Sequence, residues 1–152
     1  MTGLGLKQNN DLSVSILIIA LVTFLGILNL RSTIEKQKIA AVKTNMQIFQ
    51  ESVEIYAKNN KGKYPESNII LIKEATSKGY WKNFKNPFLK IENTVNDLKY
   101  IPESTILNKN TLSSGFIGYY TNEKRTKYII YGVGKTDNNL IEDGAVYYLT
   151  NN

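Results

Sequence analysis

The chain has 152 residues, 42% of them hydrophobic, and a formal net charge of +6 at pH 7. This length suits one compact domain plus one extended element, and the hydrophobic share excludes a disordered chain. Cysteine and histidine are both absent, which excludes disulfides, Cys/His zinc sites, thiol nucleophiles and a histidine general base, so we expect no enzyme.

An uncharged apolar segment occupies residues 12–30, with the sequence LSVSILIIALVTFLGILNL. About 20 such residues in a helix span a hydrocarbon core of roughly 30 Å, so the segment predicts a transmembrane helix. A cleaved signal peptide has a shorter apolar region that ends in small residues, unlike Leu30 and Arg31 here. A helix buried in a soluble protein would need a larger core than this chain can form. We therefore expect an uncleaved anchor, preceded by a short N-terminal segment over residues 1–11.

The helix is expected to continue beyond the anchor, because residues 31–60 are rich in helix formers and contain no proline. Apolar residues recur there at intervals of three and four, which places them on one helix face. A coiled coil would give the same spacing, but the pattern is short, and Ile48 and Ile55 widen it, which favours packing across a sheet. The residues of this apolar stripe are Ile39, Val42, Met46, Phe49, Val53 and Tyr56.

A turn is predicted directly after this helix, since Gly62 suits a C-terminal cap and Tyr64-Pro65 stops the helix. Residues 67–81 then predict a short helix with Gly79 near its end, followed by a turn at Asn86-Pro87-Phe88. Residues 89–115 show no clean period. They are expected to be mostly loop, with brief pairing allowed at residues 97–101.

Strands are predicted over residues 116–121, 127–134 and 145–150, which are rich in β-branched and aromatic side chains. The short connections between them favour antiparallel pairing of successive strands. The expected fold class is α+β, in which a C-terminal three-stranded antiparallel sheet covers the second half of the long N-terminal helix.

The order of these parts resembles a type IV pilin or the major pseudopilin of a type II secretion system. The resemblance covers nearly all of the chain beyond residue 12 and is carried by the spanning helix, its amphipathic continuation and three later segments. These segments are the turn with Gly62, Tyr64 and Pro65, the Asn86-Pro87-Phe88 turn, and the terminal YIIYGVGKTDNNLIEDGAVYYLTN. The resemblance implies a pilin-like, non-catalytic subunit, with residues 12–30 crossing the bacterial inner membrane once and residues 31–152 forming an extracytoplasmic domain. Its implied partners are the membrane, other pilin-like subunits and secretion or pilus assembly proteins, with no small-molecule substrate.

The N-terminal region departs from this family, which usually has a basic leader, a cleavage glycine and an early glutamate. Here Gly5 is followed by Leu6, and Asn10 stands five positions after Gly5, so the usual prepilin cleavage signature is lacking. This keeps an alternative open: a stationary single-pass module that binds a polymer (DNA or polysaccharide) or a protein. Orientation is also open, because the positive-inside rule alone places the C-terminal domain in the cytoplasm. The basic residues that follow the span are Arg31, Lys36, Lys38 and Lys43.

The loop TDNNLIEDG carries oxygen donors, and Asp137, Asn139 and Asp143 are candidate calcium ligands. The resemblance implies this site, since major pseudopilins carry calcium in the corresponding loop. Asp, Asn and Gly are also the residues that a tight connection needs, and the spacing does not match an EF-hand. Calcium is the single candidate cofactor.

Lysines near aromatic residues form a candidate surface for a single nucleic-acid strand. Solvated lysines beside packed aromatics explain the mixture equally well, and no nucleic-acid-binding motif accompanies it, so we do not expect nucleic acid as the partner. Ser113-Ser114-Gly115 has neither a histidine to activate a serine nor a Gly-x-Ser-x-Gly elbow, so no catalytic residue is predicted. The lysines are Lys58, Lys61, Lys63, Lys78, Lys82, Lys85 and Lys90, and the aromatic residues are Tyr64, Tyr80, Trp81 and Phe84.

Overall fold

The computed structural model describes residues 5–98, 112–135, 139–142 and 145–151, and it confirms an α+β protein with one long N-terminal helix. Helix α1 covers Gly5–Asn59, and helix α2 covers Asn68–Ser77. The chain divides into two compact units, Met1–Gln37 and Lys38–Asn152. We call the second unit the head; α1 contributes residues to both units.

The first unit contains the apolar part of α1. Its described side chains at residues 13–27 are all exposed. The Thr23 hydroxyl donates a hydrogen bond to the Ile19 carbonyl at 2.7 Å, so this polar group is satisfied within the helix. By its length and composition, this helix near the N-terminus is able to cross a membrane.

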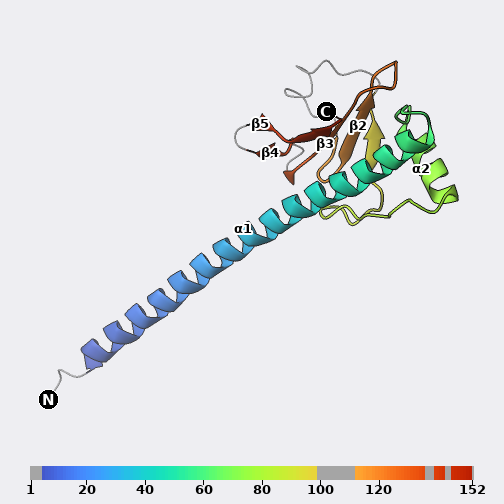
Figure 1. The fold of residues 1–152 in the computed structure, drawn as a ribbon. Helices are drawn as coiled ribbons and strands as arrows, with labels where there is room; N and C mark the ends of the chain where they lie inside the picture. The colour runs from blue at the N-terminus through green and yellow to red at the C-terminus, as the bar shows by residue number, and fades with distance from the viewer. Residues whose placement is uncertain (1–4, 99–111, 136–138, 143–144, 152) are drawn as a thin grey trace. The chain divides into compact units, whose positions relative to one another are not determined.

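The main sheet of the head has four strands in the order β1-β2-β3-β6 (Figure 1). Strand β2 pairs antiparallel with β3, and β3 with β6, as expected for successive strands. Strand β1, however, lies parallel to β2, with Val95 opposite Ile117. The prediction of a three-stranded, wholly antiparallel sheet is therefore wrong in strand number and in direction. The strands are β1 (Val95–Asp97), β2 (Ile117–Thr121), β3 (Tyr128–Gly132) and β6 (Tyr148–Thr150).

The last predicted strand is divided between two sheets. Strand β5 (Ala145–Val146) pairs antiparallel with β4 (Ile141–Glu142) in a separate two-stranded sheet. The Tyr147 backbone N–H then donates to the Leu140 carbonyl at 2.7 Å. The chain leaves one sheet at Tyr147 and enters the other at Tyr148, which explains why residues 145–150 do not form one strand.

The apolar stripe of α1 lies against the main sheet. Val42, Met46, Phe49 and Val53 are fully buried, Tyr56 is nearly so, and half-buried Ile39 packs against the same core. The rings of Phe49 and Tyr119 meet edge to face with centroids 5.4 Å apart. This core fixes the helix on the sheet.

At Gly132 on β3, side chains of α1 lie close to the backbone of the sheet. A Cβ atom placed there would lie 2.7 Å from Met46 Sδ and 2.8 Å from Val42 Cγ1. Any side chain at this position would therefore push the helix away from the strand. The missing Cβ lets two members of the apolar stripe rest directly on the backbone of β3.

Candidate functional site

The Tyr-Pro turn, residues 60–65, ends α1 and brings three distant segments together. Gly62 has φ +75°, and its N–H donates to the Ala57 carbonyl at 2.8 Å, which closes the helix with a left-handed residue. Beyond it, the Tyr64 N–H donates to the Arg125 carbonyl at 2.9 Å. The Tyr119 hydroxyl donates to the Pro65 carbonyl at 2.7 Å. The turn is therefore fixed to β2 and to the hairpin that joins β2 and β3.

The Arg125 side chain reaches from that hairpin to Tyr64 in the turn and to Tyr56 in α1. Its Nε donates to the Tyr64 carbonyl at 2.6 Å, and its Nη2 donates to the Tyr56 hydroxyl at 3.3 Å. The Tyr64 ring packs edge to face on Tyr128, with centroids 4.7 Å apart. One guanidinium thus joins the last turn of α1 to the segment that follows it.

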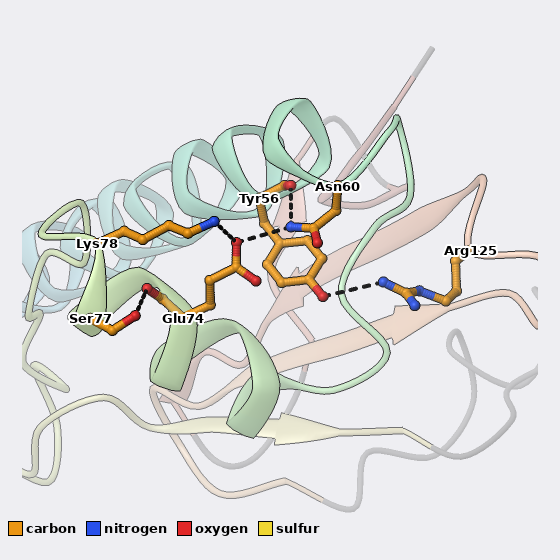
Figure 2. A network of polar contacts seen from close by, with 6 residues as sticks. All are labelled: Tyr56, Asn60, Glu74, Ser77, Lys78 and Arg125. Carbon is orange, nitrogen blue, oxygen red and sulfur yellow. Dashed lines mark hydrogen bonds and ion pairs between the residues drawn. The ribbon is translucent and has the colours of Figure 1, made fainter.

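The other side of Tyr56 leads to α2 (Figure 2). Asn60 Nδ2 donates to the Tyr56 carbonyl at 2.9 Å and to Glu74 Oε1 at 3.0 Å. The Lys78 ammonium also binds Glu74 Oε1, at 2.8 Å. The hydrogen bond from Lys78 is the main reason that the pKa of the Glu74 carboxyl is lowered, and the bond from Asn60 adds to it, while partial burial opposes both. Glu74 is therefore held as an anion that ties α2 to the end of α1.

Buried phenols complete the site. Tyr128 donates from its hydroxyl to Glu54 Oε1 at 2.6 Å and accepts from Gln50 Nε2 at 2.8 Å. Burial raises the pKa of Tyr128, and the Glu54 carboxylate raises it further. Burial likewise raises the pKa of Tyr119. Both phenols stay protonated at neutral pH, so they act as hydrogen-bond donors that stiffen the head.

A groove of about 1000 Å³ opens beside the turn. Asp97 lies on its wall, but Asp97 Oδ1 already accepts from the Asn68 N–H at 2.6 Å, at the start of α2. Partial burial raises the pKa of the Asp97 carboxyl, and the Asn68 hydrogen bond opposes that shift. Nothing in the sequence pointed to this groove, whose walls come from the residues just after the turn, α2, β1, β2 and the β2–β3 hairpin. They include Glu66, Asp97, Tyr120, Glu123 and Arg125.

The candidate calcium residues are only partly described. Asp137 and Asp143 lie outside the described residues. Asn139 is half-buried and forms an isolated antiparallel bridge with Val133 at the end of β3. Within the described ranges, no group of three or more acidic side chains could hold a metal ion. Calcium at Asp137, Asn139 and Asp143 therefore stays a prediction.

The structure separates the candidate nucleic-acid residues. Lys78 pairs with Glu74 and Lys82 with Glu51, each at 2.8 Å, whereas Lys85 and Lys90 lie in a different loop, residues 85–92. Phe84 is buried, and half-buried Trp81 packs against Phe49. These aromatic residues belong to the core rather than to an open stacking surface.

Lysines of the turn do meet another basic segment. The Lys63 ammonium donates to the Lys124 carbonyl at 3.1 Å, and Lys124 precedes Arg125 in the hairpin. Exposed Lys61 and Lys127 lie in the same two segments. We call this surface of residues 58–63 and 124–127 the basic tip. Comparisons with protein-family models, curated proteins and solved structures give no match to this chain.

Proposed function

We propose that this chain is a non-catalytic, membrane-anchored subunit of the pilin and pseudopilin kind, which works in a type II secretion or type IV pilus assembly. The observation that carries the proposal is that the apolar side chains of α1 are exposed in its first part and buried in its second part. Its first part exposes apolar side chains at residues 13–27, and its second part buries the apolar stripe against a sheet. A helix used only for packing would not expose so much apolar surface.

The Tyr-Pro turn supports the same proposal. The turn is bound to β2 by Tyr119 and to the hairpin by Arg125, so the end of α1 cannot move independently of the sheet. A subunit that assembles through its helix needs its head fixed to that helix. The polar residues described around the turn form hydrogen bonds and an ion pair with one another. We therefore interpret them as structural residues rather than as a reaction centre.

The proposed location is the bacterial inner membrane, crossed once, with the head extracytoplasmic. The basic residues after the span argue for the opposite orientation by the positive-inside rule. Protease added to intact spheroplasts distinguishes an extracytoplasmic head from a cytoplasmic one. Digestion of the head from outside supports the proposal, while protection until the membrane is opened would reverse the orientation.

The anchor itself is tested by extraction of membranes that contain the full chain. We expect the chain to stay with the bilayer through alkaline carbonate washing and to be released by detergent. A variant with Ile18→Lys and Val22→Lys places charges in the span, which cost about 2.5–3.5 kcal/mol each at the centre of a membrane helix, so more of it should appear in the soluble fraction. The matched control is Lys58→Gln and Lys61→Gln, which changes charge outside the span. Release of the unaltered chain by carbonate would contradict the anchor.

Assembly is tested by cross-linking, because the chain contains no cysteine of its own. Single variants Val14→Cys, Leu17→Cys and Leu21→Cys place the thiol on one face of the exposed apolar part of α1, and Ile16→Cys and Ile19→Cys place it on the opposite face. Oxidation in native membranes should give disulfide dimers in a pattern that follows one helix face. Equal yields at all positions, or none, would speak against lateral packing of these helices.

The second candidate is a stationary membrane-tethered module that binds a polymer, and the basic tip favours it. Lysines from two segments that are distant in sequence converge there through the Lys63–Lys124 contact. Retention on DNA that falls steeply with salt, and falls further in Lys63→Gln and Lys124→Gln, supports this module. Equal retention on DNA and on a neutral polysaccharide would contradict the hypothesis that the basic tip binds a polymer through its charge.

A further inference from the structure

The groove beside the Tyr-Pro turn is acidic, although the protein as a whole is basic. Its walls carry the carboxylates of Glu66, Asp97 and Glu123 against the guanidinium of Arg125, in a chain whose formal net charge is +6. Glu66 and Glu123 are exposed, and within the described part of the chain neither of them forms an ion pair. The groove therefore presents an excess of negative charge to the solvent.

Arg125 is engaged on the wall of this groove by neutral groups of the head. Its Nε donates to the Tyr64 carbonyl at 2.6 Å, and its Nη2 donates to the Tyr56 hydroxyl at 3.3 Å, as Figure 2 shows for the second contact. The turn and the end of α1 thus hold the guanidinium. The carboxylates are the charged groups of the groove that remain available to a ligand.

The groove also has apolar walls. Ile70 on α2 is 40% exposed there, and half-buried Leu98 lies beside the end of β1. A ligand that fits both features has an apolar stem and a positively charged end. A lysine side chain has this form, because its four methylene groups can cover apolar surface while the ammonium stays at a carboxylate. The lining of the groove therefore suits lysines of a polypeptide.

The basic tip supplies such lysines on a compact turn. The N–H groups of Asn60 and Gly62 both donate to the Ala57 carbonyl, at 3.1 and 2.8 Å, and the Lys63–Lys124 contact holds the hairpin against this turn. The other lysines of the tip are exposed, and within the described residues none of them forms an ion pair. These lysines are Lys58, Lys61, Lys124 and Lys127.

The neighbouring charges of the tip favour a second copy over a polyanion. Glu123 directly precedes Lys124 in the hairpin, and Glu66 closely follows the turn. Both carboxylates would repel a polyanion that approached the tip. A second copy instead brings lysines for the groove and carboxylates for the tip, so its charges complement both parts of the surface.

We propose that the groove of one copy binds the basic tip of a second copy, with lysine stems over Ile70 and ammonium groups beside Glu66 and Glu123. The proposal rests on the proposed role as an assembly subunit and names the part of the head through which subunits meet. A single exposed ion pair contributes little to binding. The contact therefore depends on several lysines acting together with the apolar wall, and it is weak and sensitive to salt.

Cross-linking of the full chain in detergent tests this contact, because the chain has no cysteine of its own. One population carries Lys58→Cys in the tip and an affinity tag, and the other carries Ile70→Cys in the groove. A short bismaleimide joins thiols that lie close together. The matched control replaces Ile70→Cys with Ile69→Cys, since Ile69 is the preceding residue of α2, is also apolar, is 71% exposed and does not line the groove.

We expect residue 58 to cross-link faster to residue 70 than to residue 69. Salt near 1 M, where the Debye length is about 3 Å, should remove most of the difference. Equal rates at residues 70 and 69 in low salt would overturn the docking.

Charge reversal shows whether ion pairs hold the contact. The tip variant is Lys61→Glu with Lys124→Glu, and the groove variant is Glu66→Lys with Glu123→Lys. A population made wholly of either variant brings like charges together, and we expect the ratio of docked to free copies to fall about fivefold, the upper range for one exposed ion pair. Mixing the two variants opposes unlike charges again and should restore the cross-link, which also shows that both variants fold.

The control for net charge is Lys85→Glu with Lys90→Glu, which matches the tip variant in charge but alters a different loop. It should leave the cross-link between residues 58 and 70 unchanged. A cross-link that falls equally in this control, or that mixing the reversed variants does not restore, would overturn the docking. If Leu17→Cys still gives disulfide dimers in a parallel sample, assembly stands and the tip contact alone is wrong. Loss of both kinds of cross-link would instead remove the proposed assembly role, and the docking with it.

Discussion

Arg125 Nε donates a hydrogen bond of 2.6 Å to the carbonyl oxygen of Tyr64, and the Tyr64 N–H in turn donates to the carbonyl of Arg125 at 2.9 Å. The two residues are thus joined by reciprocal bonds across 61 positions of the sequence. This pair connects the segment after α1 to the hairpin between β2 and β3. The end of the helix and the tip of the sheet therefore behave as one structure.

Replacing Arg125 should loosen that connection. Arg125→Ala removes the donors to the Tyr64 carbonyl and the Tyr56 hydroxyl, and we expect a loss of about 1–2 kcal/mol in the free energy of unfolding, since the half-exposed site lets water replace part of each bond. Denaturant unfolding of the full chain in detergent measures it. Lys124→Ala is the control, because it deletes a neighbouring positive charge whose side chain is exposed. An equal loss in both variants would mean that charge, not the Arg125 bonds, stabilises the turn.

Gly132 should not accept a side chain. In Gly132→Ala the new Cβ would meet Met46 Sδ and Val42 Cγ1 below 3.0 Å, so α1 must shift from β3 at a cost of about 1–3 kcal/mol. Adding Val42→Ala should recover part of the stability by making room. The control is Gly26→Ala, where nothing lies within 4 Å of the added atom. If Gly132→Ala unfolds at the same denaturant concentration as the unaltered chain, the helix does not pack on the sheet as described.

Stability should fall at alkaline pH. Burial raises the pKa of Tyr119 and Tyr128 above the ordinary value of 10.0. Below pH 10 both phenols are protonated in the folded and unfolded chain; above it, only the unfolded chain releases the protons. Each such tyrosine then lowers the free energy of unfolding by about 1.4 kcal/mol per pH unit.

The tyrosine contribution can be isolated with Tyr128→Phe. Above pH 10, this variant should lose the contribution of one tyrosine, about 1.4 kcal/mol per pH unit, from the slope of the free energy of unfolding against pH. The slope between pH 7 and 9 should not change. Chemical unfolding of the full chain in detergent at a series of pH values gives both slopes. An unchanged slope above pH 10 would show that Tyr128 is not held protonated by its surroundings.

Calcium should stabilise the head if Asp137, Asn139 and Asp143 bind it. Free calcium at ten times the dissociation constant raises the free energy of unfolding by about 1.4 kcal/mol, which appears as a higher melting temperature. Asp137→Asn with Asp143→Asn should abolish the rise, and magnesium serves as the competing cation. No heat of binding and no stabilisation at millimolar calcium would end the calcium hypothesis.

Residue patterns within one element were enough to predict the long helix and its buried face. Val42, Met46, Phe49 and Val53 follow helical spacing, and Gly62 and Pro65 mark where that spacing ends. Helix α2 was likewise visible as a short apolar run before Gly79. Local periodicity depends only on neighbours in sequence, so these features could be read directly.

The parts that escaped prediction depend on contacts between distant residues. Strand β1 has three residues, with Val95 alone buried, which is too short for an alternating pattern. Its parallel partner lies beyond residue 111, and no local signal indicates that pairing. The bonds of Arg125 to Tyr64 and Tyr56 are equally invisible, because a lysine- and arginine-rich hairpin reads as a solvated connection.

The way α1 enters the head also determines how the head bears a load. Pulling on the residues before Lys38 delivers tension to the sheet through the side chains that rest on Gly132 and Tyr119, not through the end of any strand. Separating α1 from the sheet by such a pull requires all of these contacts to break at the same time. Strands peeled from the edge of the sheet would instead break one hydrogen bond after another. The head is therefore built to resist shear along the helix axis better than unzipping of its sheet.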